Sequence, residues 1–320
     1  MTNPSIKKIN GDFKDKDILS TLQFSKKDID ILFDTTDKMK KLVLTKGGSD
    51  ILRGKIMTAL FYEPSSRTFG SFVAAMQRLG GGFIPLQGMT NSSAAKGETL
   101  SDTIKTFASF SDIIVMRHPE VGSVHEAAEA TDLPVLNGGD GINEHPTQAL
   151  LDFYTIKEEL GKIDNFTITF FGELAHYRSI NSMPKLLYQY PKIKMNFVSP
   201  KQVGLSKETK KFLQEKNIRF TETEKIDDVL SETDVLYVTR VKKEFLPEVL
   251  YKKVKGQYVV DNNMVKKMKK KSIVMHNLPR IDEIAIEVDK DPRAVYLRSE
   301  MKNGMYIRMA LIALVLGKIK

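Results

Sequence analysis

The sequence predicts an α/β fold of two successive open sheets, each made of parallel strands covered by helices. Short apolar runs are followed by polar loops and then by segments with helical periodicity, a pattern typical of buried parallel strands alternating with helices. The 320 residues suffice for about two domains, and no repeat or Ser/Gly linker separates them. Ligands of such sheets bind beyond the carboxyl ends of the strands. The predicted site therefore lies in the cleft between the two domains.

In the first half, strands and helices alternate closely. The apolar residues Phe72, Met76 and Leu79 share one helical face, and Gly80 follows as a stop signal, since glycine readily ends a helix. Gly161 marks the end of a later helix in the same way. The predicted elements are a strand at 56–62, a helix at 69–79, strands at 113–116 and 134–136, and a helix from 146 to 160.

The pattern then restarts in the second half. Its strands are short apolar runs bounded by polar or turn-forming residues. The predicted elements are strands at 167–171, 194–198 and 235–239, helices at 180–190 and 206–216, shorter strands at 258–260 and 273–275, and a last helix at about 299–318.

Composition excludes several classes of protein. With no Cys, the chain forms neither disulfides nor thiolate metal sites, and this favours a cytoplasmic location. No segment is apolar for long enough to span a membrane. The net charge of +9 favours anionic ligands, but a nucleic-acid partner is not expected, and the lysines of 266–271 are predicted to be a solvated helix face. The histidines lack metal-ligand spacing, so no metal is predicted.

A polar loop between the first strand and helix carries the first functional signal. Ser65, Ser66, Arg67 and Thr68 offer three hydroxyls and a guanidinium at a helix start, where backbone N–H groups and the helix dipole favour a phosphate. The alternative is that a serine merely caps the helix. No Walker loop or dinucleotide-binding glycine motif occurs, so a nucleotide is not the leading prediction.

Two further loops are expected at the same sheet edge. Arg117 and His118 follow the strand at 113–116, and the stretch from Asn137 to His145 follows the strand at 134–136. A lone His at a helix start is commonly a structural hydrogen-bonding group. Its place beside Arg117 and the phosphate loop instead favours a role for His145 in the site.

Several stretches of this sequence resemble the catalytic chains of aspartate carbamoyltransferases, in the same order and at the same spacing. They are EPSSRTFGSF (63–72), KGETLSDT (96–103), VMRHP (115–119), GDGINEHPTQALLD (139–152), DVLYVTR (234–240) and LPRIDEI (278–284). The resemblance implies two Rossmann-like domains. Residues 1–146 would bind carbamoyl phosphate, with the C-terminal helix 299–320 packing back on them, and residues 147–298 would bind aspartate.

The resemblance also implies roles for individual residues. Ser65, Ser66, Arg67, Thr68 and Arg117 would hold the phosphate. Thr68, Arg117 and His145 would face the carbonyl oxygen and Gln148 the carbamoyl amide, while Ser92 and Lys96 match a loop lent to the adjacent subunit of a homotrimer with shared active sites. Whether regulatory chains associate stays open.

On the aspartate side, the resemblance assigns Arg178 and Arg240 to the two carboxylates of the substrate. The planar guanidinium fork suits that task, although a structural salt bridge is the alternative for any single Arg. The backbone carbonyls of Asn277 and Leu278 would accept hydrogen bonds from the reacting amines.

The chain departs from the family pattern at four positions. Lys242 stands where the family has Gln in T-R-x-Q, Asn277 replaces a Pro, Ala175 replaces a basic residue and Glu173 replaces Asp. Lys242 is the departure expected to matter most, because it follows Arg240 on the loop that would bind the substrate carboxylate. Its charge suits a carboxylate, so aspartate remains the expected substrate and Lys242 a substrate-binding residue.

The sequence therefore predicts an aspartate carbamoyltransferase that needs no cofactor. One alternative is a transcarbamylase for another amino acid or amine; the absence of Cys disfavours ornithine, whose branch usually carries H-C-L-P where this chain has His276-Asn277-Leu278-Pro279. The other is a catalytically silent homologue acting as a binding or scaffold subunit. Such a subunit would have no need to keep the whole set of residues that the resemblance assigns to the phosphate, the carbamoyl group and the carboxylates.

Overall fold

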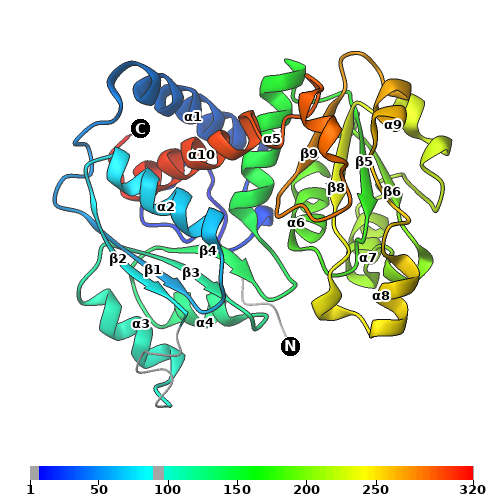
Figure 1. Cartoon of the computed structure of the whole chain (residues 1–320). Coiled ribbons are helices and arrows are strands. Elements are labelled where there is room, and N and C mark those ends of the chain that lie inside the picture. The colour runs from blue at the N-terminus through cyan, green and yellow to red at the C-terminus, as the bar shows by residue number, and fades with distance from the viewer. Residues whose placement is uncertain (1–6, 89–96, 320) are drawn as a thin grey trace. The chain divides into compact units, whose positions relative to one another are not determined.

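The computed structural model describes residues 7–88 and 97–319, and the chain divides into two units. Unit 1 comprises Met1–Leu151 with Asn303–Lys320, and unit 2 comprises Asp152–Lys302. Helices α5 (Pro146–Leu160) and α10 (Ser299–Val315) each run across a boundary between the units (Figure 1). Each unit contains one sheet of parallel strands with helices, as the sequence predicts.

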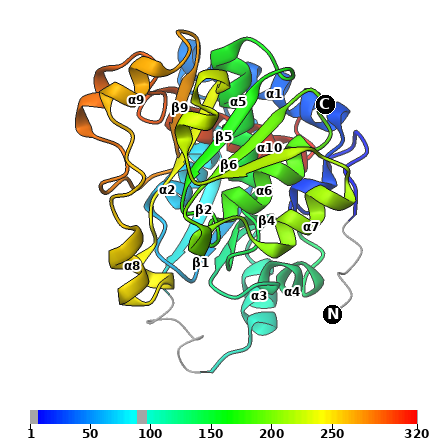
Figure 2. The same ribbon diagram turned by 90° about the vertical axis from the view of Figure 1, so that its right-hand side faces the viewer.

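Unit 1 is built on a four-stranded parallel sheet in the order β2-β1-β3-β4. Its inner strands are buried among apolar side chains such as Leu60, Ile114 and Val135. Helices α3 and α4 lie side by side (Figures 1 and 2). Besides parts of α5 and α10, the elements are η1 (Thr21–Gln23), α1 (Lys26–Lys46), β1 (Ile56–Phe61), α2 (Ser66–Arg78), β2 (Gly82–Gln87), α3 (Leu100–Ala108), β3 (Ile113–His118), α4 (Ser123–Glu129) and β4 (Val135–Asp140).

Unit 2 has a five-stranded parallel sheet in the order β7-β6-β5-β8-β9, of which β6, β5, β8 and β9 are labelled in Figure 1. The rings of Phe170, Phe197 and Tyr237 pack together on this sheet. The elements are β5 (Thr167–Gly172), α6 (Arg178–Leu187), β6 (Lys194–Val198), η4 (Lys201–Val203), α7 (Lys207–Glu215), β7 (Phe220–Thr223), η5 (Ile226–Asp228), η6 (Leu230–Glu232), β8 (Val235–Thr239), η7 (Lys243–Phe245), α8 (Glu248–Val254), α9 (Asn262–Lys267), β9 (Ile273–His276) and η8 (Ile286–Lys290).

The strand order of each sheet creates a point at which the chain changes direction across the sheet. In unit 1 this point lies between β1 and β3, where Phe61 is paired with Arg117. In unit 2 it lies between β5 and β8, where Gly172 is paired with Thr239. Loops that leave adjacent strands in opposite directions open a crevice at such a point, and ligands of open α/β sheets bind there. The ends of these four strands, and the loops and helix starts that follow them, carry the predicted residues Ser65 to Thr68, Arg117, Arg178, Arg240 and Lys242.

Some predicted elements differ from the structure. Residues 258–260 do not form a strand, because Val260 makes only an isolated bridge to Ile284. The last helix ends at Val315 rather than near 318. The predictions contain no element before residue 56, whereas the structure has α1, whose start is fixed by a capping box between Ser25 and Asp28.

Unit 2 buries a pair of carboxyl groups that predicts how its stability depends on pH. Burial, followed by the nearby charge of Asp152, raises the pKa of Glu300 well above its usual range. Tyr237 donates to Asp152 over 2.7 Å, and the His276 N–H donates to Glu300 over 3.0 Å. The folded state thus retains a proton that the unfolded state releases, so stability is lost as pH rises above the ordinary carboxyl pKa.

We expect the free energy of unfolding to fall by up to about 1.4 kcal/mol per pH unit as this proton is released. Glu300→Gln keeps an acceptor for His276 without a charge, so it should flatten the dependence and raise stability at pH 8. Urea unfolding between pH 5 and 8 measures both effects, with the exposed Glu248→Gln as the control. An unchanged slope in Glu300→Gln would show that this carboxyl does not hold the proton.

Candidate functional site

The predicted phosphate loop lies at the start of α2. Ser65 is the N-cap residue, but its side chain makes no capping hydrogen bond. Ser66 and Arg67 are exposed, whereas Thr68 is buried. Desolvation lowers the pKa of the Arg67 guanidinium, which remains charged at neutral pH. The serine therefore does not serve as a side-chain cap here, and the hydroxyls and N–H groups at this helix start suit an anion.

His145 lies at the start of α5 and is held from both sides of its ring. Its Nε2 lies 3.3 Å from Oγ1 of Thr68, and its Nδ1 lies 3.4 Å from Oγ1 of Thr147. Arg308 of α10 donates to the same Thr147 oxygen over 3.3 Å. Since a guanidinium only donates, Thr147 can direct its own proton to Nδ1, which favours the neutral tautomer with a proton on Nε2. The structure thus brings Thr68 and His145 together, with Gln148 in the same helical turn as His145.

Arg117 is the next to last residue of β3 and lies beside Glu63. Its Nη2 lies 2.7 Å from a carboxylate oxygen of Glu63, and its Nη1 donates to the Gly138 carbonyl over 3.3 Å. The Tyr62 N–H donates to the Arg117 carbonyl over 2.9 Å, which ties the end of β1 to β3. Glu63 is absent from the predicted site, although its position two residues before Ser65 of the phosphate loop was a signal that could have pointed to it. Ser92 and Lys96 lie outside the described residues.

In unit 2, Arg178 and Arg240 follow the two strands at the change of direction. Arg178 is the first residue of α6, and Arg240 directly follows β8. The guanidinium of Arg240 forms a two-point ion pair with Glu244, and its backbone N–H donates to the Tyr177 hydroxyl over 3.1 Å. Glu244 is not among the predicted residues. Its spacing of four from Arg240, common for ion pairs, was the available signal.

Lys242 points back toward the start of α6. Its Nζ donates to the His176 carbonyl over 2.7 Å and lies 4.3 Å from the centre of the Tyr177 ring. Burial lowers the pKa of its ammonium to about 8. Of the other departures from the family pattern, Glu173 is buried and accepts from the backbone N–H of His176 over 2.8 Å, while Ala175 offers no polar side chain.

Asn277 and Leu278 follow β9. The side-chain amide of Asn277 donates to Ser179 of α6 over 3.2 Å. Leu278 has a φ of 53°, a left-handed conformation that residues other than glycine rarely adopt, and its N–H donates to the His276 ring over 2.7 Å. His276 is in turn 2.7 Å from Glu283. The hydrogen bond from Leu278 to the His276 ring holds the backbone in a conformation that is unusual for leucine. Such strained backbone conformations are often found at functional sites.

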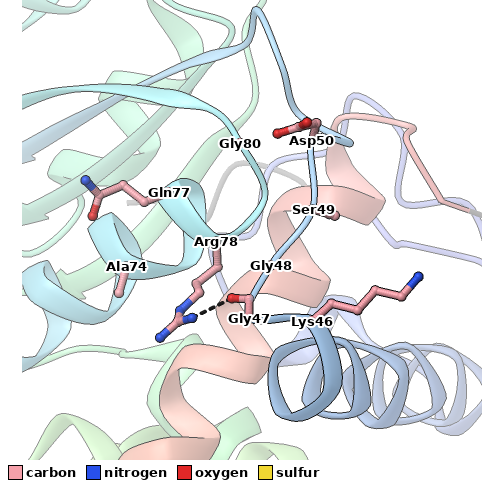
Figure 3. A pocket seen from close by; sticks show the side chains of 9 residues that line it. All are labelled: Lys46, Gly47, Gly48, Ser49, Asp50, Ala74, Gln77, Arg78 and Gly80. Carbon is pink, nitrogen blue, oxygen red and sulfur yellow. Dashed lines mark hydrogen bonds between the residues drawn. The ribbon is translucent and has the colours of Figure 1, made fainter.

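A surface hollow in unit 1 lies away from the predicted residues. It has a volume of about 660 Å³ and lies at the C-terminal ends of α1 and α2, where Arg78 donates to the Gly47 carbonyl (Figure 3). The predicted loop is at the other end of α2, roughly 20 Å away for a helix of 13 residues. Helix C-termini carry negative partial charge, so this hollow is no substitute for the phosphate site. Its lining residues are Lys46, Gly47, Gly48, Ser49, Asp50, Ala74, Gln77, Arg78 and Gly80.

Over residues 7–88 and 97–319, no group of three or more His, Asp or Glu side chains could hold a metal ion. None of the helices in the part of the chain that the structure describes is both long enough and apolar enough to cross a membrane.

Comparison with known families matches the two halves of the chain separately. Residues 16–158 match the family model described as "Aspartate/ornithine carbamoyltransferase, carbamoyl-P binding domain". Residues 164–315 match the one described as "Aspartate/ornithine carbamoyltransferase, Asp/Orn binding domain".

Individual relatives agree with these matches. The chain is 45% identical over 307 residues to the chloroplastic aspartate carbamoyltransferase of Arabidopsis thaliana, covering 95% of this chain and 78% of that protein. It is 48% identical over 303 residues to the multifunctional protein pyr1-3 of Dictyostelium discoideum, covering 94% of this chain but only 14% of that longer protein. The crystal structure of aspartate transcarbamoylase from Trypanosoma cruzi with carbamoyl phosphate and aspartate has a TM-score of 0.89 and 41% identity, covering 95% of this chain and 96% of that one.

Proposed function

Because this chain belongs to the aspartate carbamoyltransferase family, we propose that it transfers the carbamoyl group of carbamoyl phosphate to the amine of L-aspartate. The products would be N-carbamoyl-L-aspartate and phosphate, in de novo pyrimidine biosynthesis. The observation that carries the proposal is the pair of topological switch points. Each sheet directs the loops with its predicted anion-binding residues to the place where ligands of such sheets bind.

We assign carbamoyl phosphate to unit 1. Ser65, Ser66, Arg67 and Thr68 at the start of α2 would hold its phosphate together with Arg117. The contact between Thr68 and His145 supports a shared task for these two side chains at the carbonyl oxygen. Gln148, which follows His145 on α5, would bind the carbamoyl amide. Glu63 would orient Arg117 through their ion pair.

We assign L-aspartate to unit 2. Arg178 and Arg240 would bind its carboxylates, and the carbonyls of Asn277 and Leu278 would accept hydrogen bonds from the amines. The ion pair of Arg240 with Glu244 fixes the direction of the guanidinium just after β8. That pairing supports a guanidinium whose orientation is set before the substrate binds.

The proposed reaction follows from these roles. The aspartate nitrogen attacks the carbonyl carbon, forming the N–C bond as it releases a proton, and negative charge develops on the carbonyl oxygen. Thr68, Arg117 and His145 stabilise that charge more strongly than the neutral carbonyl of the ground state. The bond between this carbon and the phosphate oxygen then breaks, and phosphate leaves with the electron pair and takes up the proton that the nitrogen released. Arg67 and Lys96 meet the charge of the leaving phosphate.

We further propose a homotrimer with shared active sites, to which Ser92 and Lys96 of the neighbouring subunit would contribute. The resemblance to the family supports this assembly. Native mass measurement should give three times the mass of one chain, and a stable, active monomer would contradict it. A cytoplasmic location stays a prediction from the absence of Cys, since the Arabidopsis relative is chloroplastic.

The substrate assignment is tested by a colorimetric assay for carbamoylated products. Purified protein supplied with carbamoyl phosphate should carbamoylate L-aspartate and leave L-ornithine and L-asparagine nearly unchanged. Faster carbamoylation of another amine would restrict the proposal to the transcarbamylase class. No product with any amine in the panel would favour the silent homologue.

A further inference from the structure

Lys242 occupies a cage of aromatic and backbone groups in unit 2. Its Nζ lies 4.3 Å from the centre of the Tyr177 ring and 5.1 Å from that of Phe245. The His176 carbonyl accepts a hydrogen bond from the same nitrogen over 2.7 Å. Aromatic faces attract an ammonium most strongly when water is partly excluded, as it is here. These contacts hold the ammonium in one place.

The walls of the cage are themselves held by neighbouring groups. The His176 ring stacks on Phe245 with centroids 5.3 Å apart and an angle of 9° between the planes. Glu173 lies 3.1 Å from Nδ1 of His176. Tyr177 is buried and accepts from the Arg240 backbone. The cage therefore joins the loop after β5 to the loop after β8.

The ammonium keeps the capacity to bind a ligand. An ammonium has three N–H donors, and within the part of the chain that the structure describes it makes one hydrogen bond, to the His176 carbonyl. The guanidinium of Arg240, by contrast, already has a carboxylate partner in Glu244. Lys242 can thus offer its remaining N–H groups to a second carboxylate.

We propose that Lys242 is a specificity-determining residue that makes the amino-acid side of this site select ligands with two carboxylates. Tyr177 and Phe245 are positioning residues that hold its ammonium. The inference rests on the proposed function and deepens it, since it assigns the discrimination between a carboxylate and an amide to this cation.

The charge on Lys242 depends on every ionisable group around it. Burial lowers the pKa of its ammonium to about 8, and the charges of Arg178 and Arg240 act in the same direction. Glu173 and Glu244 oppose them. Lys242 is therefore charged at pH 7 and mostly neutral at pH 9, and binding of a dicarboxylate should weaken over that range.

Two inhibitors without a reactive amine test the inference: succinate and its monoamide, succinamate. Each is measured as a competitor of L-aspartate at saturating carbamoyl phosphate. For the unmodified protein we expect the inhibition constant of succinate to rise about tenfold between pH 7 and pH 9, as the charged fraction of a group with a pKa near 8 falls. Succinamate should be much the weaker inhibitor at pH 7.

Lys242→Gln should reduce the preference for succinate over succinamate about tenfold or more at pH 7 and remove the rise at pH 9. The matched control is Lys243→Gln, which removes the neighbouring exposed lysine and should keep both properties. Phe245→Leu removes one cage wall at a side chain that is 45% exposed, so the fold should tolerate it, and it should reduce the preference in part. Phe245→Tyr keeps an aromatic ring at this position, so it should retain the preference for succinate that Phe245→Leu partly loses.

Retention of the preference and of the pH dependence by Lys242→Gln would overturn the inference, as would an unchanged preference in Phe245→Leu. Failure of the proposed function would be visible separately, because the unmodified protein would then not carbamoylate L-aspartate at all. If the unmodified protein carbamoylates L-aspartate but Lys242→Gln keeps the preference for succinate and its pH dependence, only the inference is refuted.

Discussion

Replacement of Arg117 by alanine is expected to lower kcat by about a hundred- to a thousandfold, the loss typical of one preorganised donor to a developing oxyanion. The side chain lies at the end of β3, where its ion pair with Glu63 and its bond to Gly138 fix its direction. Alanine removes the positive charge that Arg117 would present to both the phosphate and the carbonyl oxygen of the substrate. Steady-state rates at saturating carbamoyl phosphate and aspartate measure the effect.

Two further variants show whether the loss of kcat in Arg117→Ala is specific to that residue. Arg53→Ala removes an exposed arginine of the same unit and should leave kcat unchanged. Glu63→Gln keeps Arg117 but removes its carboxylate partner, so it should cost less than Arg117→Ala because the guanidinium is then merely less well oriented. If Arg117→Ala retained more than a tenth of the normal kcat while folding normally, Arg117 would not be a donor to the reacting group.

Replacement of Arg240 by alanine is expected to act mainly on aspartate. Hydrogen bonds to charged groups contribute about 1.5–3 kcal/mol each, so losing a guanidinium that binds a carboxylate should lower kcat/KM for aspartate by roughly ten- to a hundredfold or more. Glu244 would in addition be left without its cation and would repel the substrate. Initial rates with varied aspartate provide the measurement.

The apparent KM for carbamoyl phosphate separates this effect from a general loss of structure. It should change little in Arg240→Ala, because Arg240 belongs to unit 2 and carbamoyl phosphate is assigned to unit 1. Arg219→Ala, which removes an exposed arginine of unit 2, should behave as the unmodified protein. Equal losses for both substrates would argue against a specific role in binding aspartate.

The elements of the fold could be predicted well where the sequence pattern is local. The strands at 194–198 and 235–239 have the predicted bounds, because apolar and β-branched or aromatic residues predominate in each and polar or turn-forming residues lie nearby in the sequence. The short run at 258–260 was wrongly predicted as a strand. Its apolar residues are few, and whether such a run pairs with a sheet depends on partners far away in the sequence.

The resemblance to aspartate carbamoyltransferases is confirmed by the family matches and by the relatives. The role of each site residue stays a prediction, but the structure places Thr68 beside His145 and Arg240 directly after β8. Glu63 and Glu244 were missed because their positions near Ser65 and Arg240 are weak signals, and a sequence alone does not show which arginine a carboxylate will contact.

The amino-acid sequence alone was enough to predict the α/β alternation, the family, and the loops that carry the hydroxyl, guanidinium and imidazole groups. These follow from periodicity, turn residues and short motifs, which act over a few positions. The contacts of Arg308 with Thr147 and of Lys242 with the His176 carbonyl are visible only in the folded chain. Such contacts join residues 161 and 66 positions apart, and their geometry depends on how whole strands and helices pack.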